Sequence, residues 1–176
     1  MAPKAHITVK RYDSPCGQLM LGSFADKLCL CDWLVEKHRD HVDKRLKREL
    51  KADFVEGTSP LIEQAERELD EYFDARRREF TVPLLFTGTD FQKKVWNELL
   101  NVPYGETISY AQLSERIGMP KAVRAVANVN GANAMSIFAP CHRVIGSDHS
   151  LTGYGGGLNA KRFLLELESS ENKLPL

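Results

Sequence analysis

The chain of 176 residues lacks the features that assign many proteins to a class at once. It has no net charge, because 24 Lys and Arg balance 24 Asp and Glu, so the overall charge gives no sign of a nucleic-acid partner. No segment approaches the roughly 18 consecutive apolar residues of a membrane span. The start has no apolar stretch of a secretory signal, and no repeat is present. These absences predict a globular protein of the cytoplasm, or of the nucleus in a eukaryote, without membrane contact.

The chain also lacks paired cysteines. Its four cysteines show neither a CxxC pair nor the spacing of a disulfide framework, which indicates reduced thiols. Cys29 and Cys31 would share a face of a strand, and together with His38 or His41 they could bind zinc. Because a complete four-ligand set is missing, we instead expect both to pack as small apolar side chains, and we predict no metal site.

Acidic residues are missing from one stretch. Between Gly118 and Ser147 there is no Asp or Glu, whereas Lys121, Arg124 and Arg143 are present. The charge of a contact region, rather than that of the whole chain, determines whether it can face phosphates. The stretch therefore fits a nucleic-acid surface, although a neutral helix pair with scattered bases would look the same.

The first half of the sequence predicts a small sheet followed by helix. Residues 5–35 alternate between apolar and polar positions around turn residues, which is typical of an antiparallel meander. Residues 36–52 are rich in charge and predict an exposed helix or loop. A helix follows Ser59-Pro60, and its apolar face contains Leu69 and Tyr72.

An extended connector with Pro and Gly, residues 80–88, separates this half from the next. We therefore expect an N-terminal domain over residues 1–87, which includes the connector, and a C-terminal domain over residues 88–176. A final helix from about Leu158 to Glu168 ends the second domain, and residues 169–176 are expected to be a frayed tail.

The second half predicts three further helices with clear boundaries. Thr89 and Ser109 each begin a capping box. A glycine turn at 118–119 follows the second helix, and Pro120 is expected at the first position of a third helix that ends near Gly131. The residues expected on the inner face of that helix are Val123, Val126 and Ala127. Two short helices joined by a tight turn indicate a helix-turn-helix, a motif that also occurs in proteins that never bind DNA.

A thiol between a proline and a histidine indicates a reactive site. The motif is Pro140-Cys141-His142-Arg143-Val144, and ten residues after its end Tyr154 leads into three glycines. A thiol is a nucleophile only as thiolate, so a neighbouring base matters. Glycine backbone can approach a ligand closely. The pattern predicts a nucleophile that faces a narrow pocket.

In this order the motifs resemble the O6-alkylguanine-DNA alkyltransferase (methylated-DNA–protein-cysteine methyltransferase) family, most closely from Gly88 to Glu168. The resemblance implies an α+β protein with an N-terminal ribonuclease-H-like α/β domain and a C-terminal winged-helix (helix-turn-helix) domain. It implies single-turnover transfer of the alkyl group from O6-alkylguanine, and possibly from O4-alkylthymine, in double-stranded DNA to Cys141. No cofactor takes part, and the protein would act as a monomer. The motifs that carry the resemblance are Gly88-Thr89-Asp90-Phe91-Gln92, Val95-Trp96, Pro103-Tyr104-Gly105-Glu106-Thr107, Ser109-Tyr110, Arg124-Ala125-Val126 and the cysteine motif.

The resemblance also implies roles for single residues. His142 would take the thiol proton, Glu168 would orient His142, and Tyr110 would donate to N3 of the departing guanine. Arg124 would fill the gap left by the flipped nucleotide. The remaining residues that it marks are Asn133, Val144, Tyr154, Gly155 and Lys161 for the substrate, and Lys121, Ala125 and Arg143 for DNA.

Two positions depart from the family pattern. Ala134 stands where a proline usually follows Asn133, and Gly155 stands where a serine often follows Tyr154. The first change predicts a less rigid turn before the cysteine. The second removes a side-chain hydroxyl that would contact O6, and it leaves the backbone N–H for that contact.

Three other functions remain open from the residues alone. A protein that binds the lesion without repairing it would lack the reactive cysteine. A cysteine hydrolase would use Cys141 and His142, but adjacent residues rarely place a thiol and a base in productive contact. A winged-helix regulator could use the thiol as a sensor, with an effector domain hidden in residues 1–87.

Overall fold

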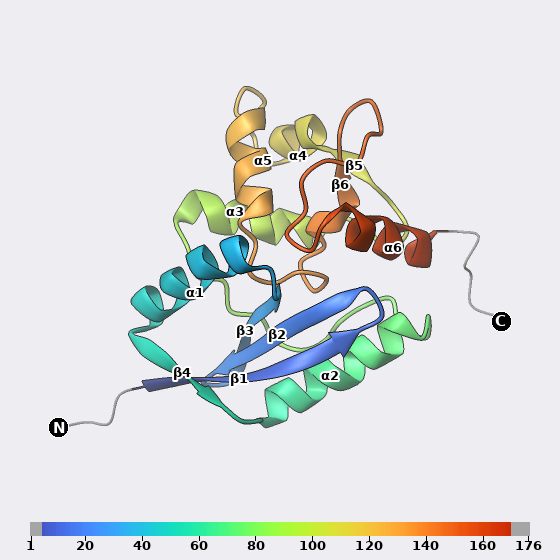
Figure 1. Ribbon diagram of the computed structural model, residues 1–176. Helices are drawn as coiled ribbons and strands as arrows, with labels where there is room; N and C mark the ends of the chain where they lie inside the picture. Colours follow the sequence, from blue (N-terminus) through green and yellow to red (C-terminus); the bar gives the residue numbers. More distant parts are fainter. Residues whose placement is uncertain (1–4, 170–176) are drawn as a thin grey trace.

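The computed structural model describes residues 5–169, without the side chains of residues 36–38, and it has the expected mixed α+β fold (Figure 1). A sheet with a helix on each face occupies the N-terminal half, and a group of helices lies above it. Most of the tail predicted at 169–176 lies outside the described residues. Within residues 5–169, no helix is both long enough and apolar enough to cross a membrane.

Four strands form the N-terminal sheet in the order β3-β2-β1-β4. The predicted antiparallel meander is confirmed as β1 (Ala5–Ser14), β2 (Gly17–Phe24) and β3 (Lys27–Trp33). The fourth strand, β4 (Ala52–Glu56), was not predicted and pairs in parallel with β1. It has five residues and only Ala52 is buried, so it carries no alternating apolar pattern that a sequence reading could detect.

A β-bulge separates Cys29 from Cys31, which the zinc alternative placed on one face of a strand. The register between β2 and β3 shifts at Gly22/Ser23, which leaves Cys29 as the extra residue of β3. Cys29 consequently packs with Leu30 in one hydrophobic cluster, whereas Cys31 packs in the other. Both are free and buried, as the packing interpretation expected. In the described part of the chain no three His, Cys, Asp or Glu side chains form a possible metal site.

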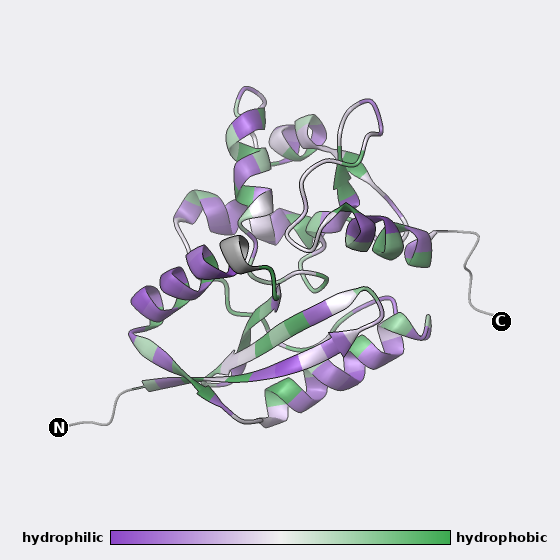
Figure 2. Cartoon of the chain, viewed as in Figure 1, coloured by the Kyte–Doolittle hydropathy of each residue, from purple (hydrophilic) through white to green (hydrophobic). Residues whose placement is uncertain are grey.

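One helix covers each face of the sheet. Residues 36–52 contain α1 (Glu36–Leu50), which is mostly hydrophilic in Figure 2 but buries Val42 and Leu46 in a cluster with residues of β1, β3 and β4. The helix predicted after Ser59-Pro60 is confirmed as α2 (Pro60–Phe73), with Ser59 as its N-cap. The opposite sheet face and α2 share the larger cluster, to which Leu69 and Tyr72 belong.

The free edge of β3 is bonded to two segments of the chain that lie outside the sheet. Leu28 exchanges backbone hydrogen bonds with the connector, at Pro83 and Leu85. Cys31 donates to the carbonyl of Ala134 and accepts from the N–H of Ser136, each at 2.8 Å. The second pair matters for the site, because it fixes the segment that precedes Cys141 to the N-terminal sheet.

The helices of the second half begin largely where their caps predict. Both capping boxes are confirmed, Thr89 with Gln92 and Ser109 with Gln112. The third helix was predicted to start at Pro120, which is wrong, because it starts at Val123. Pro120 instead occupies the second position of a turn closed by the Ala122 N–H and the Met119 carbonyl, a position that its fixed φ also suits. The elements are α3 (Asp90–Leu99), β5 (Ile108–Ser109), α4 (Tyr110–Arg116), α5 (Val123–Gly131), η1 (Cys141–Arg143), β6 (Val144–Ile145) and α6 (Leu158–Glu168).

Candidate active site

Cys141 lies at the inner end of a cavity between α5 and the loop before α6. A small cavity of about 10 Å³ touches the cysteine, and it shares four lining residues with a wider and more open cavity of about 480 Å³. The inner part holds about one water molecule, so most of the space for a ligand lies in the wider part. The shared lining residues are Gly131, Gly153, Tyr154 and Gly155.

Two asparagines brace the backbone around the cysteine. Asn133 donates from Nδ2 to the carbonyl of Ala139 at 2.9 Å and accepts the N–H of Met135 at 2.9 Å. Asn130 donates to the carbonyl of Cys141 at 3.3 Å. The turn that lacks the usual proline at Ala134 is therefore held by these side-chain bonds and by the edge of β3.

The thiol of Cys141 is protonated at rest. Burial raises its pKa to about 11, while hydrogen bonds from Asn133 and Ser136 and the charge of Lys161 oppose that rise. A free cysteine has a pKa of about 8.5. A base that accepts the proton during the reaction is thus required.

His142 is placed to be that base. Its ring is fully buried, and Nε2 lies 2.8 Å from Oε2 of Glu168. Burial lowers the pKa of His142, so the imidazole is neutral near pH 7. Because the carboxylate can only accept, Nε2 carries the proton and Nδ1 keeps a lone pair. That Nδ1 hydrogen-bonds to no group within residues 5–169.

The carboxylate of Glu168 accepts hydrogen bonds from two buried side chains, His142 and Arg143. Burial alone would raise its pKa, but hydrogen bonds and charge from His142 and Arg143 lower it far below the ordinary range. Arg143 donates from Nε to Oε1 at 2.7 Å and from Nη2 to Oε2 at 3.0 Å. The carboxylate is accordingly ionised throughout the neutral range.

The structure contradicts the expected DNA contact of Arg143. Its side chain is 7% exposed, and its remaining Nη1 donates to the carbonyl of Val102 at 2.7 Å. A buried guanidinium that already binds Glu168 and Val102 with three of its five N–H groups is not placed to contact a phosphate. The basic residue next to the motif belongs to the interior because it neutralises the buried carboxylate.

Lys161 is also a buried cation with backbone partners. Its Nζ donates to the carbonyl of Val144 at 2.7 Å and to that of Thr152 at 2.9 Å, so it ties the loop before α6 to the strand after the cysteine motif. The Cys141 carbonyl already accepts from Val144 N–H and from Asn130, which occupies both lone pairs. The resemblance implies that the carbonyls of Cys141 and Val144 face the guanine amino group. Of these two, only that of Val144 keeps a free lone pair beyond the bonds described.

The wall opposite α5 rests on the N-terminal sheet. Tyr154 packs edge-on against Trp33 of β3, with ring centroids 5.8 Å apart. Gly156 lies so close to the Trp33 indole that an added Cβ would come within 2.6 Å of it. Gly155 lines both parts of the cavity. Glycine at position 156 is therefore required for close packing against Trp33.

Tyr110 reaches the outer part of the cavity from the first turn of α4. Its hydroxyl oxygen accepts a hydrogen bond from Thr152 Oγ1 at 3.1 Å, and its ring lines the wider cavity. The phenol proton stays available for a bound ligand. Tyr110 and the loop that carries Thr152 are thus positioned to contact the same bound ligand.

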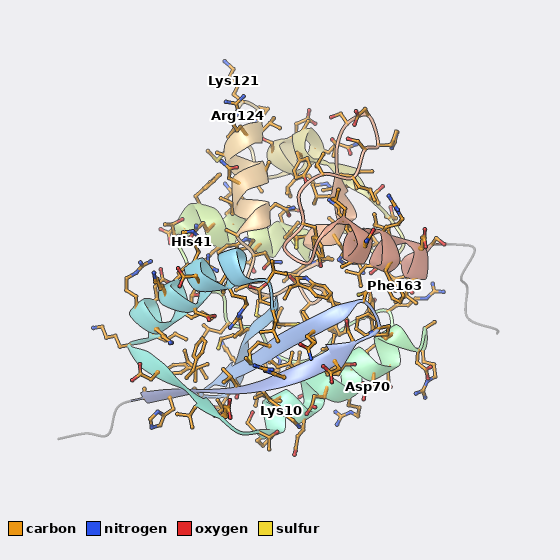
Figure 3. All side chains as sticks on the ribbon, viewed as in Figure 1. Lys10, His41, Asp70, Lys121, Arg124 and Phe163 are labelled. Carbon is orange, nitrogen blue, oxygen red and sulfur yellow. The ribbon has the colours of Figure 1, made fainter. Side chains whose placement is uncertain are left out.

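Exposed basic residues gather at the outer end of α5. Lys121 and Arg124 extend from the tip of the molecule in Figure 3, and Ala125 beside them is exposed. Arg124 lies four residues before Asn128, which lines the wider cavity, so both share one face of the helix. Ala127, expected inside, is half-buried and lines the same cavity. The basic tip and the cavity mouth therefore follow one another along α5.

Sequence reasoning missed four residues that the fold adds to this site. Asn130 and Ser136 flank Asn133 but carry no motif of their own. Trp33 and Tyr72 belong to apolar stretches of the first half, where they could only be assigned to the core. Their distance along the chain from Cys141 hides them, because only tertiary packing brings the two halves together.

Comparison with known proteins agrees with this geometry. Residues 90–170 match the family described as "6-O-methylguanine DNA methyltransferase, DNA binding domain". The methylated-DNA–protein-cysteine methyltransferase of Methanosarcina barkeri is 42% identical over 162 residues, which cover 92% of this chain and 96% of that protein. The Mycobacterium bovis protein of the same name is 43% identical over 167 residues, 93% of each chain. A crystal structure of Mycobacterium tuberculosis OGT in complex with DNA superposes with a TM-score of 0.78 at 42% identity, covering 94% of this chain and 93% of that one.

Proposed function

The chain belongs to the methylated-DNA–protein-cysteine methyltransferase family, and we propose that Cys141 is the residue that accepts the alkyl group. The protein repairs O6-alkylguanine in DNA by direct transfer to one of its own cysteines. Support for Cys141 comes from its place at the inner end of the cavity, next to the buried pair of His142 and Glu168.

The proposed reaction is a displacement at a saturated carbon. The thiol proton passes to Nδ1 of His142, through one bridging water, and the sulfur attacks the alkyl carbon. A sulfur–carbon bond forms while the O6–carbon bond breaks, and its electron pair stays on guanine. A hydrogen bond from Tyr110 at N3 stabilises the charge that develops there. The thioether cannot be reversed by any group of this site, so each chain acts once.

The base must leave the duplex to reach the thiol. We propose that Arg124 fills the space of the flipped nucleotide and that Lys121 and the exposed backbone near Ala125 contact phosphates. Asn133 braces the nucleophile, the second lone pair of the Val144 carbonyl accepts from the guanine amino group, and the Gly155 N–H donates to O6. Tyr154 forms the pocket wall. Lys161 holds the loop that closes over the base, and its charge favours the thiolate.

The proposed function also bears on the domain boundary, the oligomeric state and the location in the cell. We propose a domain boundary between residues 87 and 88, because the family match starts at residue 90 and the connector precedes it. We also propose that the protein acts as a monomer on double-stranded DNA, since one chain supplies the nucleophile, the relay and the basic tip. We propose that the protein is located in the cytoplasm, or in the nucleus of a eukaryote, where both DNA and reducing conditions are present.

The decisive experiment is peptide mapping after reaction with a duplex that contains O6-methylguanine. One methyl group per protein is expected, on the peptide that contains Cys141, and Cys141→Ser should bind the duplex without accepting the methyl. A methyl group on Cys16, Cys29 or Cys31, or many methyls removed per protein, would overturn the proposal. Cys16 is the sharpest comparison because, of these three thiols, it alone is not fully buried.

A further inference from the structure

A tyrosine of the N-terminal domain reaches the relay of the C-terminal domain. The hydroxyl of Tyr72, on α2, donates to Oε2 of Glu168 at 2.5 Å, across 96 residues of sequence. Tyr72 is fully buried. This is the same carboxylate oxygen that His142 contacts through Nε2.

Three aromatic rings fix the direction of the Tyr72 hydroxyl. Phe73 meets the Tyr72 ring edge-on at 5.1 Å and Tyr104 does so at 6.2 Å, while Phe80 lies tilted at 5.5 Å. A ring held on three sides cannot turn away from Glu168 without disturbing the core. The contact is therefore built into the packing between the domains.

The hydroxyl acts as a donor toward a charged acceptor. Burial and the negative charge of Glu168 raise the pKa of Tyr72 well above its usual value, so the phenol keeps its proton. Oε2 accepts from three groups, Tyr72, His142 and Arg143. Each donor draws on the same negative charge, so a bond from Tyr72 weakens the attraction of Glu168 for the imidazole proton.

We propose that Tyr72 is a positioning residue of the repair reaction: it holds the Glu168 carboxylate in place and limits how strongly this carboxylate raises the basicity of His142. The inference rests on the relay proposed above and adds that the N-terminal domain tunes it. The aromatic stretch at the end of α2 therefore has a role in alkyl transfer besides its role in the core.

Other ionisable groups also face Glu168 and His142, and a test must leave these groups unchanged. From η1, Arg143 pairs with Glu168, and from α6 the charge of Lys161 acts on His142. Tyr104 lies beside the carboxylate, and its ring is stacked by Arg143 and by Arg78. Tyr154 and Cys141 line the adjoining cavity. Removal of the Tyr72 hydroxyl alone leaves all of these side chains chemically intact.

The test compares Tyr72→Phe with Tyr104→Phe. Each change removes one phenolic hydroxyl from adjoining rings, but the Tyr104 hydroxyl donates to the Leu167 carbonyl at 3.3 Å instead of to Glu168. Without the Tyr72 bond, Glu168 stabilises protonated His142 more strongly, so the pKa of His142 rises. In single-turnover transfer the acid limb of the pH–rate profile should move up by about half a unit to one unit. Tyr104→Phe should leave the limb in place.

A limb that coincides in the two variants, or that moves down in Tyr72→Phe, would overturn the proposal. Tyr72 replaced by 3-fluorotyrosine, which keeps the hydroxyl and makes it a stronger donor, should shift the limb the opposite way even if Tyr72→Phe folds poorly. His142→Ala distinguishes a failure of the proposed relay from a failure of the proposed role of Tyr72. If it transfers as fast as the parent, the relay itself is wrong; if it is slow while the Tyr72 limb stays fixed, only the role of Tyr72 is wrong.

Discussion

Replacing Glu168 with glutamine tests how the buried charges of this site depend on one carboxylate. Glu168 accepts four hydrogen bonds, one from Tyr72, one from His142 and two from Arg143. A glutamine amide has one oxygen with two lone pairs, and its NH2 group would face donors. At least two donors would lose their partner in a site that excludes water.

The magnitude follows from those losses. Removing one partner of a buried ion pair typically costs about 3–5 kcal/mol, because the other charge stays buried without compensation. Glu168→Gln should therefore lower the free energy of unfolding at pH 7 by about that amount. Glu115→Gln, at an exposed position of α4, should stay within about 0.5 kcal/mol.

The difference in the free energy of unfolding between the parent and Glu168→Gln should depend on pH. The folded-state pKa of Glu168 lies below that of an unfolded glutamate, so its stabilisation is present above about pH 4.3 and is lost as the pH falls toward the folded value. The difference between the parent and Glu168→Gln should narrow below about pH 4.3. Burial lowers the pKa of His142, so both proteins lose a further contribution as the pH falls below about 6.5.

Urea unfolding at several pH values, together with single-turnover transfer, measures both effects. The transfer rate of Glu168→Gln should fall between those of the parent and His142→Ala, which we expect to be slower by about 10²–10⁴-fold. The reasoning would be refuted if Glu168→Gln were as stable as Glu115→Gln at pH 7. A stability difference that stayed constant down to acid pH would refute the assignment of the low pKa.

The remaining predictions concern DNA and the pocket wall. Arg124→Ala should slow repair in duplex DNA far more than reaction with free O6-benzylguanine, and equal losses would exclude a role in base flipping. Lys121→Ala should reduce the slope of log affinity against log salt by about 1, whereas Arg143→Met should leave that slope unchanged and destabilise the fold, as gel shifts over a salt series can show. Gly156→Ala should slow transfer to Cys141 at unchanged DNA affinity, because its Cβ would displace the Trp33 indole and the loop that carries Tyr154.

The sequence by itself determined the local features of this protein. The capping boxes at Thr89 and Ser109, the meander of the first three strands and the span of α6 depend on neighbouring residues, and all agree with the structure. The cysteine motif and its order among the other motifs were sufficient to indicate the family. Where a local signal had two uses, as for Pro120, the interpretation from sequence placed the helix start three residues early.

Only the tertiary structure decided which side chains meet. Arg143 was expected on the DNA surface, yet it is buried, because the end of α6 brings a carboxylate to it from 25 residues away. A bulge separates Cys29 from Cys31, and β4 forms only because β1 offers it an edge. Tyr72 and Trp33 join the site from the N-terminal half of the chain, and their apolar surroundings in sequence are those of any core residue. Contacts across such separations depend on packing of the whole chain, so no local pattern records them.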